Sequence, residues 1–417
     1  MPAEQAAGTR RGTPRTSGGD AVTFGGLFRN RSFTVLYIAG TQSQLGDQLA
    51  RVALSVLVFS RTGSGMLTAT TYALTFLPAF FGGLFLAGLA DTKPRRGLLV
   101  TCDLLRAALF ALMAIPAAPL WLIAVLLVAA VLIGSPYNAA EPAIVADLFT
   151  GPEYQTAVGF RTATSQAMQL LGFGFGGVIV ALTGANAALV VDAVTFACAA
   201  VLIRVGLAAL APTVQAAESA GQLRTGARAI AGDPNLRNLL GFAWLAAFWV
   251  VPEGLAAPYA SGHGSGPLAV GLLLAANPVG NLIGTVVLTR WVRPASRSRL
   301  LGWFAVFCGL PLLACVTGPP VWLAFALWGL SGLFTSYLVI VIAEFVATVA
   351  PAVRGQAIGL ASSSLLAAQG IGLVLGGAIA ARGGPGPAIA VAGALGSLAA
   401  VGLALARRRR AAEVAAA

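Results

Sequence analysis

The chain has 417 residues, of which 58% are hydrophobic and only 10% are charged. Soluble domains carry about 25% charged residues, so this composition excludes an ordinary soluble protein and predicts a chain that crosses a membrane several times. The formal net charge of +12 does not indicate nucleic-acid binding, because the basic residues flank the apolar segments, as orientation charges do.

The first 32 residues are rich in glycine, threonine, serine and arginine and contain no apolar core. We therefore expect no secretory signal peptide and a cytoplasmic tail over residues 1–32. The last part of this tail, Phe24–Phe33, is expected to lie along the membrane surface.

A membrane-spanning helix needs about 20 predominantly apolar residues, and twelve such segments follow the tail. The predicted spans are 33–60, 66–90, 97–116, 119–146, 157–182, 185–206, 237–260, 267–289, 299–317, 320–349, 356–381 and 386–406. The predicted fold is an all-α membrane protein with two six-helix bundles, 33–206 and 237–406. A cytoplasmic loop over 207–236 joins the bundles, and a basic cytoplasmic tail covers 407–417.

Basic residues are distributed unevenly between the two sides of this arrangement. The predicted inner loops and tails hold most of the Lys and Arg residues, whereas the outer loops hold only Arg61 and Arg382. Because Lys and Arg are retained on the cytoplasmic side, we expect both termini in the cytoplasm and place the protein in the bacterial inner membrane.

The two bundles are expected to be repeats of one another. Shifting the chain by 200 residues superimposes the fifth span on the eleventh with their glycine spacing preserved. The coinciding pairs are Tyr137 with Tyr337, Gly172 with Gly372, Gly176 with Gly376 and Gly177 with Gly377. Such a repeat is typical of transporters built from two parallel halves.

A polar stripe runs along the first span. Gln44, Asp47, Gln48, Arg51 and Ser55 recur at three- and four-residue steps, so they share one face that must meet protein or water. Arg51 lies one turn from Asp47 and can pair with it. We interpret Asp47 as a proton-binding site; the alternative is a permanent ion pair that holds the span in its bundle.

Two further acids are predicted to lie within spans. Glu253 follows Pro252, which interrupts its helix, and the aromatic residues Trp244 and Phe248 precede it. Glu253 is either a second protonatable group, a counter-charge for a cationic substrate, or a partner for backbone groups that the proline leaves free. Asp192 either lines the outer cavity or pairs with a neighbouring helix. With Asp47 and Arg51, these residues form the predicted proton-coupling set.

Amide side chains complete the predicted cavity. Asn277 and Asn281 are four residues apart, and Gln169 lies on the polar face of the fifth span. They either hydrogen-bond a substrate or hold helices together. The predicted substrate-cavity residues are Gln44, Gln48, Tyr137, Asn138, Gln169, Trp244, Phe248, Asn277, Asn281 and Tyr337.

Four ionisable residues nearer the inner ends of spans are expected to form gating or structural pairs at the cytoplasmic face. Asp103 and Arg106 are one turn apart in the third span, Glu141 lies in the fourth and Glu344 in the tenth.

The loop between the second and third spans, A-G-L-A-D-T-K-P-R-R (87–96), resembles the signature G-x-x-x-D-[RK]-x-G-R-[RK] of the major facilitator superfamily. Asp91, Arg95 and Arg96 fall on the acid and the last two basic positions. Gly88 is displaced by one position, and Thr92 and Pro94 replace a basic residue and a glycine.

The resemblance implies a cytoplasmic gate in which Asp91 contacts the inner end of the eleventh span or the loop near Arg354. This latch would favour the outward-open state. The expected gate residues are Gly88, Asp91, Lys93, Arg95, Arg96 and Arg354.

Four segments are similar to the enterobactin-exporter-like group of bacterial efflux proteins. They are L-F-R-N-R-S-F (Leu27–Phe33), S-Q-L-G-D (Ser43–Asp47), D-L-L-R-A (Asp103–Ala107) and D-A-V-T-F (Asp192–Phe196). The fifth span also resembles the glycine-rich antiporter motif G-P-x-x-G-G, without its proline, and this resemblance implies antiport.

The predicted function is secondary active transport, because the chain has no Walker motif through which ATP could drive it. Its single histidine, His263, lies outside the spans, so we expect no catalytic triad. We expect proton-coupled efflux of an amphiphilic organic molecule by alternating access, and no enzymatic activity. The expected partners are this substrate, protons and membrane lipids, with no nucleic acid, metal or cofactor, and the protein is expected to be a monomer. The alternatives are an importer of a small metabolite on the same fold and a non-transporting sensor or lipid-handling protein.

Overall fold

The computed structural model describes residues 24–86, 88–208 and 219–416. These residues form helices and connecting turns, with no strand among them. The N-terminal half contains α1 (Phe24–Leu27), α2 (Arg31–Thr62), α3 (Gly65–Ala73), α4 (Leu77–Phe85), α5 (Leu89–Thr92), α6 (Arg95–Met113), α7 (Leu120–Leu148), α8 (Gly151–Thr183) and α9 (Ala185–Gly206). The connecting helix α10 (Ser219–Gly232) follows.

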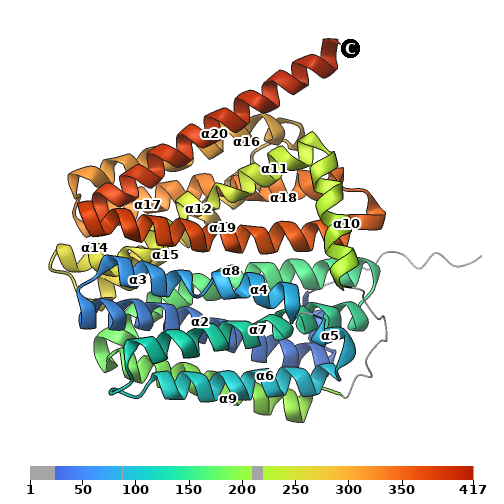
Figure 1. The fold of residues 1–417 in the computed structure, drawn as a ribbon. Coiled ribbons are helices and arrows are strands. Elements are labelled where there is room, and N and C mark those ends of the chain that lie inside the picture. Colours follow the sequence, from blue (N-terminus) through green and yellow to red (C-terminus); the bar gives the residue numbers. More distant parts are fainter. Residues whose placement is uncertain (1–23, 87, 209–218, 417) are drawn as a thin grey trace, which may run out of the picture.

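The C-terminal half contains α11 (Pro234–Trp244), α12 (Ala246–Trp249), α13 (Val251–Gly254), α14 (Ala256–Gly262), α15 (Pro267–Arg290), α16 (Pro294–Leu313), η1 (Ala314–Thr317), α17 (Val321–Thr335), α18 (Tyr337–Thr348), η2 (Pro351–Val353), α19 (Arg354–Gly383) and α20 (Pro385–Ala416). α20 continues through the predicted basic tail as one helix. Figure 1 shows the two halves packed side by side, with α10 crossing from one to the other.

Ten segments of the described chain are long and apolar enough to cross a membrane. They coincide with ten of the predicted spans. The other two predicted spans, 33–60 and 97–116, are the continuous helices α2 and α6, which are packed in the same bundle. Both carry mid-helix charges that lower their hydropathy. The protein is therefore an all-α, multi-pass membrane protein, as predicted.

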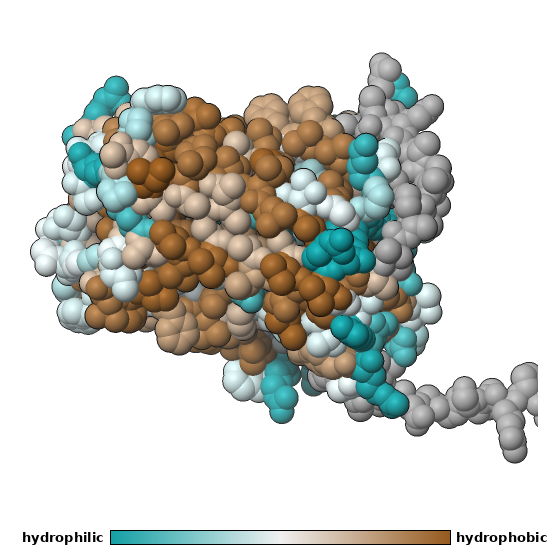
Figure 2. Space-filling model, turned by 90° about the horizontal axis from the view of Figure 1, so that it is seen from below, coloured by the Kyte–Doolittle hydropathy of each residue, from teal (hydrophilic) through white to brown (hydrophobic). Residues whose placement is uncertain are grey.

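The surface has the form that a lipid bilayer requires. Figure 2 shows a broad hydrophobic band between two more hydrophilic ends. Large apolar side chains on α6 and α9, such as Leu104, Val194 and Val205, are exposed. An exposed apolar surface of this extent is stable only against lipid.

Capping residues explain where several helices begin and end. The Asn30 side chain accepts hydrogen bonds from the backbone N–H groups of Ser32 and Phe33 at 3.0 and 3.2 Å, so α2 starts there. Gly63, with φ of 62°, ends α2 in the left-handed conformation that glycine adopts without strain. The predicted interruption near Pro252 is present, because the seventh span is divided into α11, α12, α13 and α14.

The two halves meet along two equivalent pairs of helices, α8 with α15 and α19 with α3 and α4. The glycine repeat predicted from the sequence explains this arrangement. A Cβ atom on Gly177 would lie 2.9 Å from Gly271 Cα on α15, and one on Gly377 would lie 2.8 Å from Ala69 Cβ on α3. Because both positions lack a side chain, each half brings a helix backbone against the other.

Two names are used below for the ends of the bundle. The basic end holds α5 and α10, with Lys93, Arg95 and Arg96. The far end holds the connections at Gly63, between α14 and α15, and at Gly384. The contact between Gly177 and Gly271 lies toward the far end, so the halves are packed together there.

Candidate functional site

Asp47 on α2 and Arg106 on α6 form an ion pair between two helices. Arg106 Nη2 donates to Asp47 Oδ1 at 2.6 Å. The Arg106 side chain is 12% exposed and that of Asp47 is 31% exposed, so the carboxylate is the more accessible partner. The expected pairing of Asp47 with Arg51 is therefore wrong, because an arginine on a neighbouring helix reaches this carboxylate.

Three of the sequence segments noted above converge on this ion pair. A Cβ atom on Gly46 would collide with the Asp192 carboxylate, so the missing side chain lets α9 approach α2. Asp192 is fully buried, and Thr195 Oγ1 donates to its Oδ1 at 3.2 Å. The Phe196 ring lies 4.0 Å from the Arg106 guanidinium carbon, a cation–π contact that holds the guanidinium in place.

Asp103 belongs to the same group, one turn before Arg106 on α6. Its side chain is completely buried, and among the described residues neither of its carboxylate oxygens has a hydrogen-bond partner. The expected pairing of Asp103 with Arg106 is therefore not made, because Arg106 is bonded to Asp47. We call Arg106, Asp47, Asp103 and Asp192 the Arg106 cluster.

A cavity of about 200 Å³ lies beside the Arg106 cluster. Asp47, Arg51 and Asn138 line it from the N-terminal half, and Leu366 on α19 lines it from the C-terminal half. The remaining wall is mostly apolar and consists of Ala50, Leu54, Thr75, Phe76, Ala79, Arg106, Phe110, Leu127, Ala130, Val131 and Gly134. Sites for drug-sized ligands measure roughly 300–1,000 Å³, so this conformation admits only part of such a molecule.

Arg51 faces the same cavity from the other side. Its guanidinium carbon lies 5.1 Å from the centre of the Phe76 ring and 5.9 Å from that of Tyr72. The Tyr72 hydroxyl donates to Glu253 Oε2 at 3.0 Å. Since Tyr72 lies on α3 and Glu253 on α13, this hydrogen bond joins the two halves, and the Arg51 charge acts on both residues.

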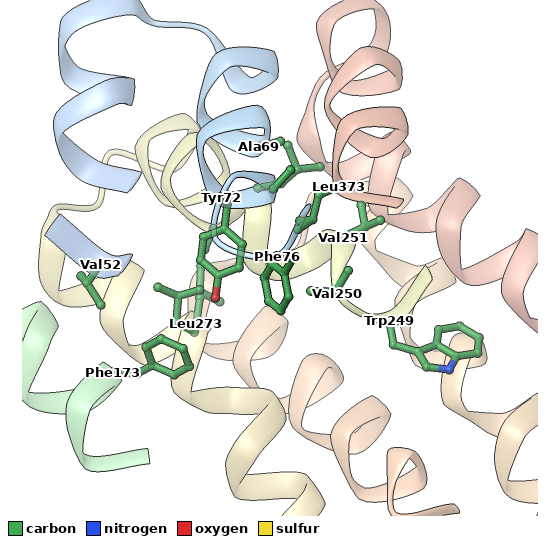
Figure 3. Close-up of a cluster of buried hydrophobic side chains, with 14 of the residues drawn as sticks. Val52, Ala69, Tyr72, Phe76, Phe173, Trp249, Val250, Val251, Leu273 and Leu373 are labelled. Carbon is green, nitrogen blue, oxygen red and sulfur yellow. The ribbon is translucent and has the colours of Figure 1, made fainter. Parts of the chain in front are cut away.

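Apolar side chains surround this junction. Figure 3 shows Tyr72 and Phe76 of the N-terminal half close to Val250, Val251 and Leu373 of the C-terminal half. These residues are buried. Moving the halves apart would expose this cluster and break the bond between Tyr72 and Glu253, so the junction closes the far end in this conformation.

The comparison with known families agrees with this architecture. A family model described as the Major Facilitator Superfamily matches residues 36–255, more than half of the chain.

The chain belongs to the major facilitator superfamily.

Among curated members of the superfamily, the chain is similar to the uncharacterized MFS-type transporter YkuC of Bacillus subtilis (strain 168). The two are 25% identical over 181 residues, which is 43% of this chain and 42% of that protein. The matched region therefore spans about two fifths of the relative's length.

Solved transporters share the fold at low sequence identity. The POT family transporter PepTSo has a TM-score of 0.72 at 13% identity, over 91% of this chain and 98% of that chain. A bacterial homologue of the human lysosomal transporter Spinster, inward-facing and unoccupied, has a TM-score of 0.66 at 14% identity, over 91% and 94%. These likenesses concern the fold alone. The chain is a multi-pass membrane protein of the major facilitator superfamily.

The predicted proton-coupling residues occupy two places in this major facilitator fold. Asp47 and Asp192 belong to the Arg106 cluster, whereas Arg51 and Glu253 lie at the junction with Tyr72. Sequence reasoning missed the role of Tyr72 and the partner of Asp47. A mid-helix arginine needs a partner, and this signal could have identified Arg106.

Of the ten predicted cavity residues, Asn138 lines the cavity beside the Arg106 cluster. Gln48 packs against Gly172 of α8, and the Tyr137 side chain is buried. Tyr337 does not line the cavity; it is fully buried, and its hydroxyl donates to the Phe242 carbonyl at 2.9 Å.

The other predicted cavity residues lie at helix contacts or are half-buried elsewhere. Gln166 Nε2 on α8 donates to Asn281 Oδ1 on α15 at 3.2 Å, so Asn281 joins these two helices. Gln169, one turn after Gln166 on α8, is half-buried. The Trp244 indole donates to Ser364 Oγ at 3.1 Å. Three residues complete the set: Gln44 is half-buried on α2, Phe248 packs against the Trp249 ring, and Asn277 contacts Gly332.

The expected gate residues lie at the basic end. Gly88 precedes α5 and Lys93 follows it. Arg95 forms an ion pair with Asp147 of α7, and Arg96 donates to the Arg204 carbonyl of α9. These bonds fix α6 to its neighbours within one half.

The predicted contact of Asp91 with the start of α19 or the loop near Arg354 lies outside the described residues, because the position of the Asp91 side chain is not among them. Arg354, at the start of α19, makes a long hydrogen bond of 3.5 Å to the Val349 carbonyl.

Two other predicted acids at this end are paired. Arg161 Nη2 donates to Glu141 Oε2 at 2.5 Å, and Arg407 Nη2 to Glu344 Oε2 at 2.6 Å. Each pair lies within one half and is structural in this conformation.

Proposed function

We propose that this transporter exports an amphiphilic organic molecule in exchange for protons across the bacterial inner membrane. The basic end faces the cytoplasm in this proposal, because Lys and Arg are retained on that side. The far end, where the halves are packed together, then faces outward. The structure would represent a state closed to the outside.

The observation that carries the proposal is the ion pair of Asp47 with Arg106 on the wall of the cavity. A carboxylate at this depth is costly and calls for a functional explanation. Asp47 is the more accessible partner, and the cavity also contacts Leu366 of the other half. A proton on Asp47 would neutralise the negative charge of the pair. A movement of the two halves would change the surroundings of this carboxyl group.

Glu253 is proposed as a second titrating group that acts on the far end. Its bond from Tyr72 connects the halves. A protonated carboxyl accepts a hydrogen bond less strongly than a carboxylate does. Protonation of Glu253 from outside would therefore weaken the closed far end and favour the outward-open state.

The nature of the cavity wall supports an amphiphilic substrate. Apolar residues such as Phe76, Phe110 and Leu127 are the more numerous in the lining, and Asn138, Thr75 and the charged residues give the wall a polar surface nearly as large as its apolar one. A sugar would require many more hydrogen-bonding groups. The cavity must widen for a drug-sized molecule, and alternating access provides such a change.

The direction of transport rests on the resemblance to enterobactin-exporter-like efflux proteins. Three of its four segments, which contain Asp47, Arg106 and Asp192, meet in the Arg106 cluster. A resemblance concentrated in the charged centre of the protein bears more directly on transport than one carried by lipid-facing residues.

The test uses inside-out membrane vesicles from an efflux-deficient bacterium and a panel of fluorescent amphiphilic dyes. With an acidic vesicle interior, the wild-type protein should accumulate at least one dye, and a protonophore should abolish this. Asp47→Asn should lose gradient-driven accumulation, whereas Glu153→Gln, the same chemical change at an exposed position, should keep it.

Other outcomes would contradict the proposal. Accumulation only in right-side-out vesicles would indicate an importer. Absence of any substrate-dependent proton flux across a broad panel would favour a non-transporting protein. Full gradient-driven transport by Asp47→Asn would remove Asp47 from the coupling mechanism.

A further inference from the structure

Asp103 is a buried acid to which the proposed transport cycle has not yet assigned a role. It is completely enclosed, and both of its carboxylate oxygens are without hydrogen-bond partners in the part of the chain that the structure describes. Burying a charge is costly unless the charge is paired and hydrogen-bonded. A carboxyl in this position must therefore be neutral or gain a partner.

The surroundings of Asp103 provide one positive charge for several acids. Among the described residues, Arg106 is the cation that acts on Asp103, and its guanidinium also interacts with Asp47 and Asp192. Asp47 on α2 and Glu141 on α7 also act on Asp103, and the charge of Asp103 acts on the Tyr137 hydroxyl. Cys102 is the neighbouring titratable group on the same helix.

In this conformation Arg106 forms its hydrogen bond with Asp47 and none with Asp103. Its Nη2 is bonded to Asp47, while its Nε is buried without a hydrogen-bond partner among the described residues. Asp103 lies one helical turn from Arg106, on the side of the basic end, where i,i+3 neighbours are in reach of each other. A small rotation of the guanidinium can therefore move its hydrogen bond from Asp47 to Asp103.

We infer that Asp103 is a second proton-binding residue, and that Asp47 and Asp103 exchange Arg106 during the transport cycle. The inference rests on the proposed proton-coupled function and extends it. In the proposed resting state, Asp47 is ionised and bonded to Arg106, and Asp103 holds a proton. When Asp47 takes a proton from the cavity, its charge-assisted bond to Arg106 is lost. Arg106 then turns to Asp103, which gives up its proton.

The exchange balances in protons and charge. One proton enters at Asp47 and one leaves from Asp103, while the third acid of the cluster, the buried Asp192, stays neutral throughout. At every stage Arg106 therefore faces one carboxylate, and the other acids of the cluster are neutral. The site therefore never contains a second unpaired charge, which would be costly in the membrane interior. No oxidant, metal or cofactor is required.

The polar groups between Asp103 and the basic end offer a route for the released proton. The Tyr137 hydroxyl is buried and has no hydrogen-bond partner among the described residues. A Cβ atom on Gly40 of α2 would lie 3.5 Å from Glu141 Oε1 and 4.0 Å from this hydroxyl, so the two groups adjoin the same point of α2. Glu141 is in turn paired with Arg161, so the polar groups extend from Asp103 through Tyr137 and Glu141 to Arg161.

The test measures protonation directly and needs no substrate. Infrared spectra of the purified protein in lipid nanodiscs report the carbonyl stretching band of protonated carboxylic acids, which shifts in deuterium oxide. At neutral pH, the wild type should show a band that Asp103→Asn lacks. Asp192→Asn and Glu153→Gln should keep this band, because neither change gives Asp103 a new partner.

The exchange of Arg106 between the two acids predicts a second change in the spectra. In Asp47→Asn, Arg106 is released from its ionised partner and becomes available to Asp103, so the Asp103 band should be lost although Asp103 is present. A buried acid with a merely structural role would keep its proton in this variant. If Asp103→Asn does not fold, Asp103→Glu replaces it, and the band should shift in frequency.

Two results would overturn the inference. A spectrum of folded Asp103→Asn identical to that of the wild type would show that Asp103 holds no proton. Persistence of the Asp103 band in Asp47→Asn would show that the two acids do not share Arg106. Because the spectra are recorded without substrate, either result is distinguishable from a failure of the vesicle assay, which tests transport itself.

Discussion

The Tyr72 hydroxyl donates a hydrogen bond to Glu253 Oε2 at 3.0 Å, and this bond connects the two halves of the protein. Arg51 lies beside it, against the Phe76 ring. Apolar side chains from both halves surround the Tyr72 ring (Figure 3). A polar bond in such surroundings is stronger than one in water, and leaving one partner unpaired there is costly.

Tyr72→Phe should weaken the closed far end. The change removes one hydroxyl and retains the ring, so a bond to a charged acceptor, about 1.5–3 kcal/mol, is lost. A loss of about 1.4 kcal/mol changes an equilibrium tenfold, so the open population should rise at least about tenfold. Spin labels at Leu67 and Leu268, exposed positions on α3 and α15, in a protein with Cys198→Ala, report this as longer distances.

Tyr37→Phe is the matched control for this experiment. The Tyr37 hydroxyl bonds Thr164 Oγ1 at 2.5 Å within the N-terminal half, so its loss should leave the distances unchanged. Equal distance distributions for Tyr72→Phe and the wild type would show that the bond does not hold the halves together.

Glu253→Gln should separate the hydrogen bond from the charge. The glutamine carbonyl can still accept from Tyr72, so the far end should stay closed, but it cannot bind a proton. The wild-type distances should lengthen as the pH falls, because the protonated carboxyl is the weaker acceptor, and the variant should lose this dependence. A variant that retains the wild-type pH dependence would exclude Glu253 as the titrating group.

Arg106→Gln should destabilise the protein more than any exposed arginine substitution does. Removing one partner of a buried ion pair costs about 3–5 kcal/mol, and the partial exposure of Asp47 places this pair at the lower end of the range. The melting temperature in detergent should fall by about 3 °C. Arg290→Gln, at an exposed position, should change it little.

Adding Asp47→Asn to Arg106→Gln should restore part of this stability, since one unpaired charge is removed with its partner. A double variant whose loss equals the sum of the two single losses would contradict an energetic coupling between the residues.

Gly177→Val should force the far end open. The added side chain would begin 2.9 Å from Gly271 Cα, a backbone atom that cannot turn aside. Inserting atoms into such a contact costs about 1–3 kcal/mol, so the distance between labels at Leu67 and Leu268 should increase. At Gly174 of the same helix nothing lies within 4 Å, and Gly174→Val should leave the distance unchanged.

Features that depend on a single helix were predicted well from the sequence. The apolar lengths located the spans, and Pro252 indicated the interruption of the seventh. The glycine repeat also held, because Gly177 and Gly377 occupy equivalent contacts between the halves. Each feature follows from local hydropathy, backbone chemistry or spacing, which are properties of the chain before it folds.

Features that depend on which helices are neighbours were predicted less well. Arg51 was assigned to Asp47 because the two are one turn apart, yet Arg106 takes this role and Arg51 lies between Tyr72 and Phe76. The spacing within one helix shows which residues share a face. It does not show which other helix supplies the side chain that meets this face.

The sequence alone determined that this protein is a bundle of membrane helices in two similar halves, because burial in lipid demands long apolar segments whatever their arrangement. Only the tertiary structure decided that one arginine stands among three aspartates from three helices, and that a tyrosine of one half binds a glutamate of the other. The reason is physical: the energy of a charge in a membrane depends on its nearest partners, and packing of distant segments chooses those partners.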